Sequence, residues 1–242
     1  MRHPLTTTTP ERCAAAVSDL FDVVFQDLES WRDSIAQAGA STRPAELDAL
    51  VESLVIPSLT LPHPTLIGAG FIAAPEFVHG RDVHFSWWLG PLESNPLLGI
   101  TTVPTRLDLG ARIYTEYLRD VRQLEWYSIP ESTHQRHVTG PYVDHLCTCD
   151  YIFTVTMPVR VGQQMIGVVG ADVSVRRLET ALLPLFLAAD QPLALVNAVG
   201  RVVISTEPTV QVGQLAPHDG AAVDCAGVPF RVLISPATPS RD

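Results

Sequence analysis

A pair of strand-like segments joined by a short turn constrains this chain more than any other feature: residues 151–159 and 165–174, with the turn at 161–163. In the first segment, apolar side chains alternate with threonines at the period of two that is typical of a β-strand. One face carries Tyr151, Phe153, Val155, Met157 and Val159, and the other carries Thr154 and Thr156. The sequence therefore predicts a long antiparallel hairpin.

The second segment carries a carboxylate on an apolar face. Asp172 falls on the same strand face as Ile166, Val168 and Gly170. Burying a carboxylate costs free energy unless a cation or hydrogen-bond donors meet it. Asp172 is therefore a candidate ligand-binding residue. The alternative is a strand-end carboxylate that is solvated or bonded to backbone donors.

Helices are predicted elsewhere in the chain. Apolar side chains at steps of three and four predict helices over residues 10–37, 44–55, 105–122 and 176–186. The second of these is expected to stop at Pro57, and a loop is expected over residues 128–139.

Short apolar runs and turn signals predict the remaining strands. Residues 192–235 contain two hairpin-like pairs, and short apolar runs at 65–73 and 83–88 predict strands separated by turns. A helix followed by a sheet that another helix interrupts is typical of an α+β protein. We expect an N-terminal helical region over 1–58, a ligand-binding module over 59–177, and a connecting helix with a smaller β unit over 178–242.

Composition excludes several classes of function. The chain has 46% hydrophobic and 17% charged residues, which is typical of a globular protein. Its net charge of −10 and its lack of lysine argue against a nucleic-acid partner, because phosphate binding needs clustered cations. The first ten residues lack the apolar core of a signal peptide, and no run of about 18 apolar residues exists. Membrane insertion is therefore not expected.

The four cysteines form no recognisable disulfide framework. Cys147 and Cys149 are separated by one residue, which is not the spacing of a redox or zinc motif, and Cys13 and Cys225 lie far from both. Free thiols indicate a reducing compartment, so we expect a cytoplasmic protein.

Aromatic residues with polar tips precede and follow a second aspartate. Trp126, Tyr127 and Tyr142 lie near Asp144 in the sequence, and such side chains are either core aromatics or the walls of a binding site. Asp144 follows a Gly-Pro pair, where an aspartate commonly serves as a turn residue. Other aromatic candidates are Tyr117, off the buried face of the 105–122 helix, and one of Trp87 and Trp88, which must point to opposite faces of a strand.

An enzyme is the rival interpretation from a different class. Asp144 or Asp172 could act as a general base with His134 or His137 nearby. No nucleophile elbow and no phosphate-binding loop are present, and the histidine spacing does not fit a metal site. No cofactor or metal is expected.

Three segments resemble the membrane-distal module of double Cache sensor domains, which are PAS-like ligand-binding domains also called PDC sensors. They are Trp126-Tyr127, the Pro-Tyr-Val-Asp run at 141–144, and the Gly-Val-Val-Gly-Ala-Asp-Val-Ser run at 167–174. The similarity is specific over residues 110–180. It implies a PAS-like antiparallel sheet after a long helix, a smaller second β unit, and a non-enzymatic role in bacterial signal transduction.

The resemblance also implies roles for particular residues. Trp126, Tyr127 and Tyr142 match aromatic positions of the amino-acid-binding branch, and Asp144 and Asp172 match the two acidic positions that receive the ligand ammonium.

The arginine that holds the ligand carboxylate in that branch is replaced here by Leu124. An acidic, aromatic site without this guanidinium favours an amine, and the sequence is more similar to the amine-binding branch. An amino acid or small carboxylate remains the alternative if Arg112, Arg119 or Arg122 replaces the missing arginine.

Cache domains usually lie between two transmembrane helices, and neither helix is present in this sequence. We therefore expect a free-standing form that signals to a separate regulator or transporter, or through a homodimer. The apolar stripe of the 10–37 helix could form the dimer seam or pack on the protein's own sheet.

Overall fold

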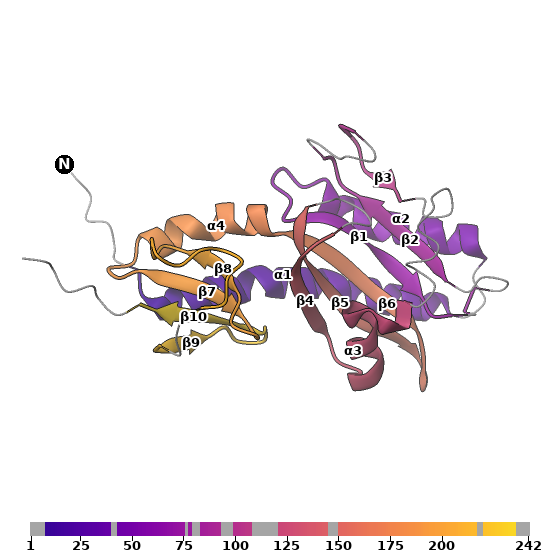
Figure 1. Ribbon diagram of the computed structural model, residues 1–242. Helices are drawn as coiled ribbons and strands as arrows, with labels where there is room; N and C mark the ends of the chain where they lie inside the picture. Colours follow the sequence, from indigo (N-terminus) through magenta and orange to yellow (C-terminus); the bar gives the residue numbers. More distant parts are fainter. Residues whose placement is uncertain are drawn as a thin grey trace, which may run out of the picture. The chain divides into compact units, whose positions relative to one another are not determined.

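The structure is a computed structural model that describes residues 8–39, 43–75, 77–78, 83–92, 99–107, 121–144, 150–216 and 220–235. The chain divides into two compact units, one of Val24–Ser174 and one of Met1–Val23 with Val175–Asp242. Both are α+β, as the sequence predicts (Figure 1). The three-part division expected from the sequence stays a prediction.

Four α-helices are described: α1 (Pro10–Ala38), α2 (Pro44–Leu59), α3 (Glu125–Thr133) and α4 (Val175–Leu187), with a short 3₁₀ helix η2 (Val121–Gln123). The apolar stripe expected on α1 is almost entirely buried within the chain. The stripe therefore packs on the protein itself. A homodimer through α1 would need another face of this helix, and stays a prediction.

The larger unit is built on a six-stranded antiparallel sheet. Its strands are β1 (Leu66–Ala73), β2 (His84–Leu89), β3 (Thr105–Arg106), β4 (His137–Val143), β5 (Tyr151–Val161) and β6 (Gln164–Ser174), in the order β3-β2-β1-β6-β5-β4. The predicted hairpin is β5 and β6, and Asp172 lies opposite Thr154 in its register. This hairpin places Asp172 in the interior of the sheet.

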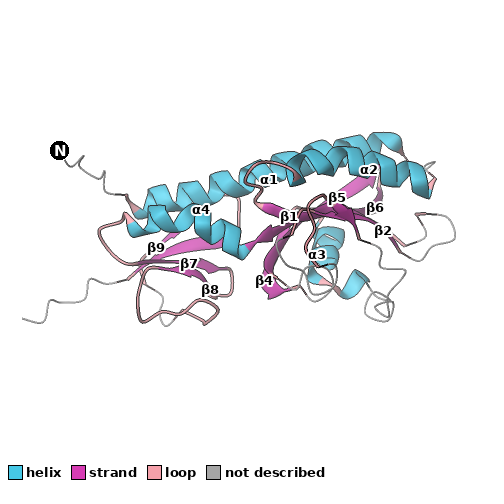
Figure 2. Cartoon of the chain, turned by 90° about the horizontal axis from the view of Figure 1, so that it is seen from above, coloured by secondary structure: helices cyan, strands magenta, loops and turns pink. Residues whose placement is uncertain are grey.

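Helices cover both faces of this sheet. In Figure 2, α2 and the second half of α1 lie over one face, and α3 lies on the other. The face with Met157 meets α1, where Arg32 Nη1 lies 3.2 Å from the Met157 sulfur. The face with Thr156 meets α3, because the Thr156 hydroxyl donates to the Trp126 carbonyl at 2.8 Å. The alternation read from the sequence thus separates an α1/α2 face from an α3 face.

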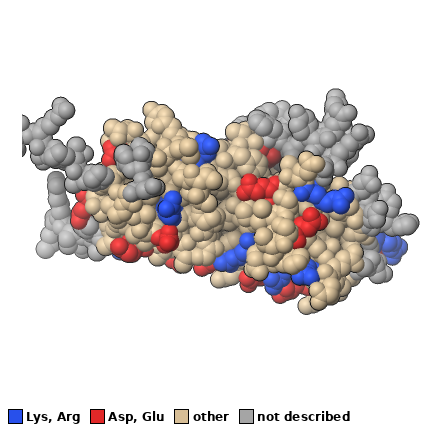
Figure 3. All heavy atoms as spheres, turned by 60° about the horizontal axis from the view of Figure 1, so that its bottom comes forward, with Lys and Arg blue, Asp and Glu red and all other residues tan. Residues whose placement is uncertain are grey.

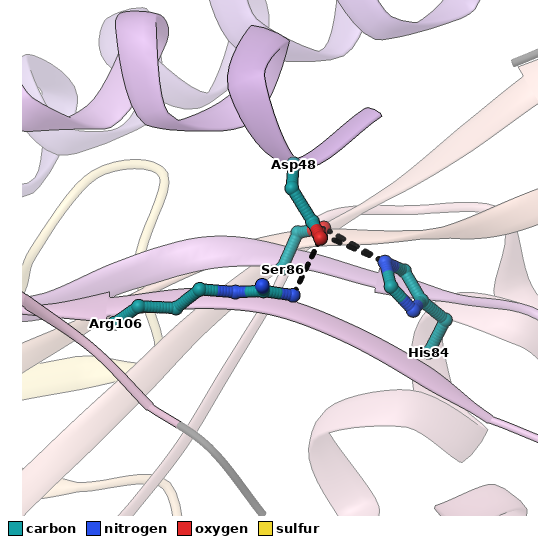
Figure 4. Close-up of polar contacts among 4 residues, drawn as sticks. All are labelled: Asp48, His84, Ser86 and Arg106. Carbon is teal, nitrogen blue, oxygen red and sulfur yellow. Dashed lines mark hydrogen bonds and ion pairs between the residues drawn. The ribbon is translucent and has the colours of Figure 1, made fainter. Parts of the chain in front are cut away.

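A polar cluster connects α2 to the sheet (Figure 4). Asp48 of α2 accepts from Arg106 Nη2 at 2.6 Å, lies 2.9 Å from His84 Nε2, and accepts from the Ser86 hydroxyl. His84 and Ser86 are buried side chains of β2, and Arg106 comes from β3. The carboxylate therefore binds donors from two strands and fixes α2 over them.

The smaller unit contains a four-stranded antiparallel sheet. It consists of β7 (Leu193–Asn197), β8 (Val202–Ser205), β9 (Ala222–Asp224) and β10 (Phe230–Ile234), in the order β8-β7-β10-β9. The two predicted hairpins are both present, and pairing of β7 with β10 joins them. The core of this unit is apolar, with Phe21 of α1 packed on Phe230 at 5.1 Å between ring centroids.

Three predicted element boundaries are wrong. Residues 105–106 form a strand paired with β2 and do not begin a helix, since Arg106 binds Asp48; residues 108–120 of that predicted helix lie outside the described residues. Part of the expected 128–139 loop is α3, a short helix held by burial of Trp126, Tyr127 and Pro130. Helix α2 continues past Pro57 because Leu59 is buried.

No helix in the described ranges is long and apolar enough to cross a membrane. On the face drawn in Figure 3, arginine side chains are interspersed with Asp and Glu and form no continuous basic patch among the residues coloured.

Candidate functional site

Helix α3 places two of the predicted aromatic residues on the sheet. Trp126 and Tyr127 are both buried, with ring centroids 6.3 Å apart and ring planes at 80°. The hydrogen bond from Thr156 to the Trp126 carbonyl anchors this turn to β5. Both rings belong to an apolar cluster that also includes Trp87 and Tyr142. The structure therefore brings the three predicted aromatics together.

A β-bulge positions the third aromatic residue. Thr139 lies opposite Thr154, but Tyr142 lies opposite Ile152, so β4 contains one extra residue between these pairs. Directly opposed residues of an antiparallel pair share a face, and the extra residue turns Tyr142 to the same face as Thr154. Without the bulge, Pro141 would occupy this place.

Asp172 ends a chain of hydroxyl groups on the α3 face. The Thr154 hydroxyl donates to Asp172 Oδ1 at 2.7 Å. Since a hydroxyl has one proton, the Tyr142 hydroxyl is the donor in its 2.5 Å contact with Thr154 Oγ1. The chain fixes one oxygen of the carboxylate and orients both side chains toward it.

Asp172 and Asp144 form a pair of buried acids. Their exposed fractions are 4% and 5%, and they lie close enough to interact electrostatically. Burial raises the pKa of Asp172 well above its ordinary value, the charge of Asp144 raises it further, and the Thr154 hydrogen bond lowers it. No arginine or histidine in the described segments forms a salt bridge with Asp172. The site is thus acidic, and the described segments supply no ion-pair partner for this carboxylate.

Trp87 lies on the same face as Asp172. Its indole packs over two glycines of β1: an ideal Cβ at Gly70 would lie 2.9 Å from Trp87 Cε3, and one at Gly68 would lie 2.9 Å from Nε1. The Gly68 position is also 3.2 Å from Asp172 Oδ2. The two glycines therefore leave the space that the indole and the carboxylate occupy.

Trp88 points to the other face of the sheet, with the Arg106 guanidinium 5.8 Å from its ring centroid. The sequence leaves open which of the two tryptophans lines the site. In the structure Trp87 belongs to the candidate site, and Trp88 packs on the α2 side.

Tyr127 is held in its neutral form. Burial raises the pKa of its phenol to about 12, the charge of Glu131 adds to this, and that of Arg122 opposes it. The Tyr127 hydroxyl is buried and has no hydrogen-bond partner in the described part of the chain. It is therefore available as a hydrogen-bond donor at neutral pH.

Several sequence candidates do not join this cluster or cannot be placed. Tyr117, Arg112 and Arg119 lie outside the described residues. Arg122 is an exposed residue of η2, close enough to Tyr127 for its charge to act on the phenol.

In the described part of the chain, the contacts of the histidines named for an enzyme are with neither Asp144 nor Asp172. His137 Nε2 lies 2.9 Å from Glu125 Oε1, and His134 is an exposed residue that ends α3. No group of three metal-ligating side chains occurs within the described ranges.

Sequence reasoning missed Thr154 as a partner of Asp172 and left Trp87 undecided. Glycines at 68 and 70 on one strand face gave a usable signal, because alternate glycines in a strand indicate that another group approaches the backbone closely. The pairing of β1 with β6, which brings Gly68 opposite Asp172, has no local signature.

Comparisons with known proteins agree with this architecture. Residues 87–180 match the family described as methyl-accepting chemotaxis protein-like, first PDC sensor domain. No curated protein matches the chain.

Solved structures of similar fold include "Methyl-accepting Chemotaxis protein X", with a TM-score of 0.62 and 15% identity over 93% of this chain and 95% of that one. The ligand-binding domain of the Pseudomonas aeruginosa amino-acid chemoreceptor PctB in complex with L-Arg has a TM-score of 0.58 and 17% identity, over 93% and 90%. That of PctC in complex with GABA has a TM-score of 0.56 and 17% identity, over 92% and 95%.

These likenesses span nearly the whole chain, whereas the family match covers its central part. The protein has the α+β fold of PDC chemoreceptor ligand-binding domains, and the segment matching the first PDC sensor domain contains the described aromatic and acidic residues of the candidate site.

Proposed function

We propose that this chain is a non-enzymatic sensor module that binds a small amine. Asp172 and Asp144 contact the ammonium group, and Trp126, Tyr127 and Tyr142 are the aromatic contacts. Tyr117 stays a candidate contact outside the described residues. The observation that carries the proposal is the pair of buried acids, in which Asp172 forms no salt bridge with any described arginine or histidine.

The physical argument concerns charge. Two carboxylates near each other in a buried place repel, and a protein relieves this by taking up a proton or a cation. An ammonium ion can donate hydrogen bonds to both carboxylates, and aromatic faces attract it. The structural neighbours support the ammonium contact, because the L-Arg and GABA of their descriptions each carry such a group.

A second ligand class has its own support. The same neighbours bind molecules that also carry a carboxylate. Leu124 cannot bind a carboxylate, so an amino acid would require another arginine. Arg122 is the described candidate, because its charge reaches Tyr127. An amino-acid ligand is therefore the alternative to a simple amine.

The test is a thermal-shift screen of amines, amino acids and small carboxylates, followed by calorimetric titration of each hit. A ligand at 100 times its Kd stabilises the folded state by about 2.7 kcal/mol, which is readily seen as a rise in Tm. We expect amines to stabilise the wild type and not Asp172→Asn. The control is Asp19→Asn, which removes an exposed carboxylate of α1 in the smaller unit and should leave the hits unchanged.

Different outcomes separate the alternatives. Stabilisation by amino acids that Arg122→Met removes would favour the amino-acid site. Stabilisation by carboxylates alone would contradict the amine proposal. Consumption of a hit during incubation would instead favour the enzyme interpretation, with Asp144 or Asp172 as general base.

We also propose a location and a downstream partner for this protein. A free-standing cytoplasmic domain would pass its signal to a separate regulator or transporter, or to a second copy of itself. Fractionation of cells producing the full-length protein tests the location, and sedimentation with and without the hit tests the second copy.

A further inference from the structure

Trp87 carries a polar group that the fold does not use. The side chain is 4% exposed, and its Nε1–H is buried without a hydrogen-bond partner among the described residues. A buried donor left unpaired costs about 1–3 kcal/mol, and native proteins leave few of them. An unpaired indole N–H at a candidate binding site is therefore expected to have a use when a ligand is present.

The position of this donor is defined by Gly68. Trp87 Nε1 and Asp172 Oδ2 lie 2.9 and 3.2 Å from one point, the place where a Cβ of residue 68 would be. A neutral donor and a carboxylate therefore converge over a backbone position that has no side chain. Because both atoms lie close to one point, a compact ligand whose ammonium nitrogen and acceptor oxygen are close together can meet both of them.

We propose that Trp87 is a specificity-determining residue whose Nε1–H donates to an oxygen of the ligand while Asp172 binds its ammonium group. The ligand is then a compact amino compound with the nitrogen and the oxygen on neighbouring carbons. The proposal rests on the amine-binding function argued above and narrows its ligand class.

The charge of the site further restricts the oxygen. An indole donor is neutral, and the two nearby groups Asp172 and Asp144 are acids. A ligand carboxylate beside them would add a third negative group, and no arginine or histidine of the described residues forms a salt bridge with Asp172 to offset it. The site therefore fits a neutral acceptor, as in a vicinal amino alcohol or amino amide.

The experiment compares ethanolamine with propylamine, which has a methyl group in place of the hydroxyl. Both are titrated by calorimetry into the wild type, Trp87→Phe, Trp88→Phe and Asp172→Asn. In the wild type, ethanolamine should bind about 3–10-fold more tightly than propylamine, the amount typical of one net hydrogen bond. Trp87→Phe should remove this preference by weakening ethanolamine only, and Asp172→Asn should weaken both probes.

Trp88→Phe is the matched control, because it makes the same substitution in the adjacent buried residue on the opposite face of β2. It should leave both affinities within a factor of two. A second readout is the indole N–H signals in a ¹H–¹⁵N spectrum: the signal that Trp87→Phe removes should move downfield with ethanolamine and not with propylamine.

The possible results distinguish the role of the Trp87 donor, the vicinal ligand class and amine binding itself. Equal wild-type affinities, or an equal loss of both probes in Trp87→Phe, would overturn the role of the donor while leaving Asp172-dependent amine binding intact. Failure of both probes to bind would overturn the vicinal ligand class. In that case larger amines from the thermal-shift screen, tested against Asp172→Asn, would still judge the amine function separately.

Discussion

Two aspartates of the larger unit, half-buried Asp48 and buried Asp172, lie on opposite sides of one sheet, and their surroundings differ. Asp48, on the α2 side, has an arginine, a histidine and a serine hydroxyl around its carboxylate. Asp172, on the α3 side, has a threonine hydroxyl and the charge of a second aspartate. Among the described residues, Asp48 is therefore paired with an arginine and a histidine, whereas Asp172 is paired with neither. This difference is what we expect between a carboxylate that stabilises the fold and one that is proposed to bind a cationic ligand.

The largest effect on stability should come from removing the carboxylate of Asp48. Asp48→Ala leaves buried His84 and Ser86 without their acceptor and Arg106 without its ion pair, so we expect a loss of about 2–4 kcal/mol of unfolding free energy. Urea denaturation measures it. The control is Glu52→Ala, at an exposed position of the same helix. A loss below about 1 kcal/mol would contradict a stabilising role for the cluster.

Filling the space beside Asp172 should destabilise the protein somewhat less than removing the Asp48 carboxylate does. Gly68→Ala would place a Cβ 2.9 Å from Trp87 Nε1 and 3.2 Å from Asp172 Oδ2, so both side chains must shift. We expect a destabilisation of about 1–3 kcal/mol and a loss of affinity for the screened amine of at least about tenfold. Gly90→Ala is the control, because its nearest neighbour would lie at 3.5 Å. Unchanged amine binding in Gly68→Ala would place the ligand elsewhere.

Removing the charge of Asp172 should raise the stability of the protein, whereas removing that of Asp48 should lower it. The pKa of Asp172 is raised in the folded state, so wild-type stability falls as pH rises from the unfolded value of 3.8 toward the folded one and stays reduced above it. Without ligand, Asp172→Asn should therefore be more stable than wild type at neutral pH by about 1–2 kcal/mol, a rise of a few degrees in Tm. The gain should vanish below pH 3.8. A less stable variant at neutral pH would mean that Asp172 serves the fold.

The smallest effect concerns the hydroxyl that supports Asp172. Thr154→Val keeps the shape of the side chain and removes the hydrogen bond that lowers the pKa of Asp172. A higher pKa leaves less carboxylate for an ammonium, so amine affinity at pH 7 should fall about 2–10-fold. Because raising the pH favours the charged form of Asp172 in both proteins, the difference from wild type should shrink as the pH is raised. Calorimetry over a range of pH checks this, and a difference independent of pH would contradict the mechanism.

The local part of this architecture could be predicted from the sequence. The alternation in residues 151–159 fixes which strand face carries Thr154, and the same period places Asp172 on a face of its own strand. Helix α1 and both hairpins of the smaller unit could also be predicted, since their patterns of apolar residues extend over enough residues to show a period.

The elements that were predicted wrongly or left undecided depend on contacts between distant segments. Helix α3 has nine residues, too few for a period, and forms because Trp126 and Tyr127 are buried on the sheet. The strand at 105–106 follows from an ion pair with a helix about sixty residues earlier. Sequence alone could not choose between Trp87 and Trp88, because that choice follows from the pairing of β2 with β1.

The junction that follows Asp172 has a mechanical consequence. Strand β6 ends at Ser174 and α4 begins at Val175, with no residue between them, and Ser174 is itself held by a bond from its hydroxyl to Asp150. A loop would give slack that absorbs a small movement. Here the carboxylate stands three residues from the first turn of α4, so no flexible linker separates the candidate site from the helix that follows it in the chain.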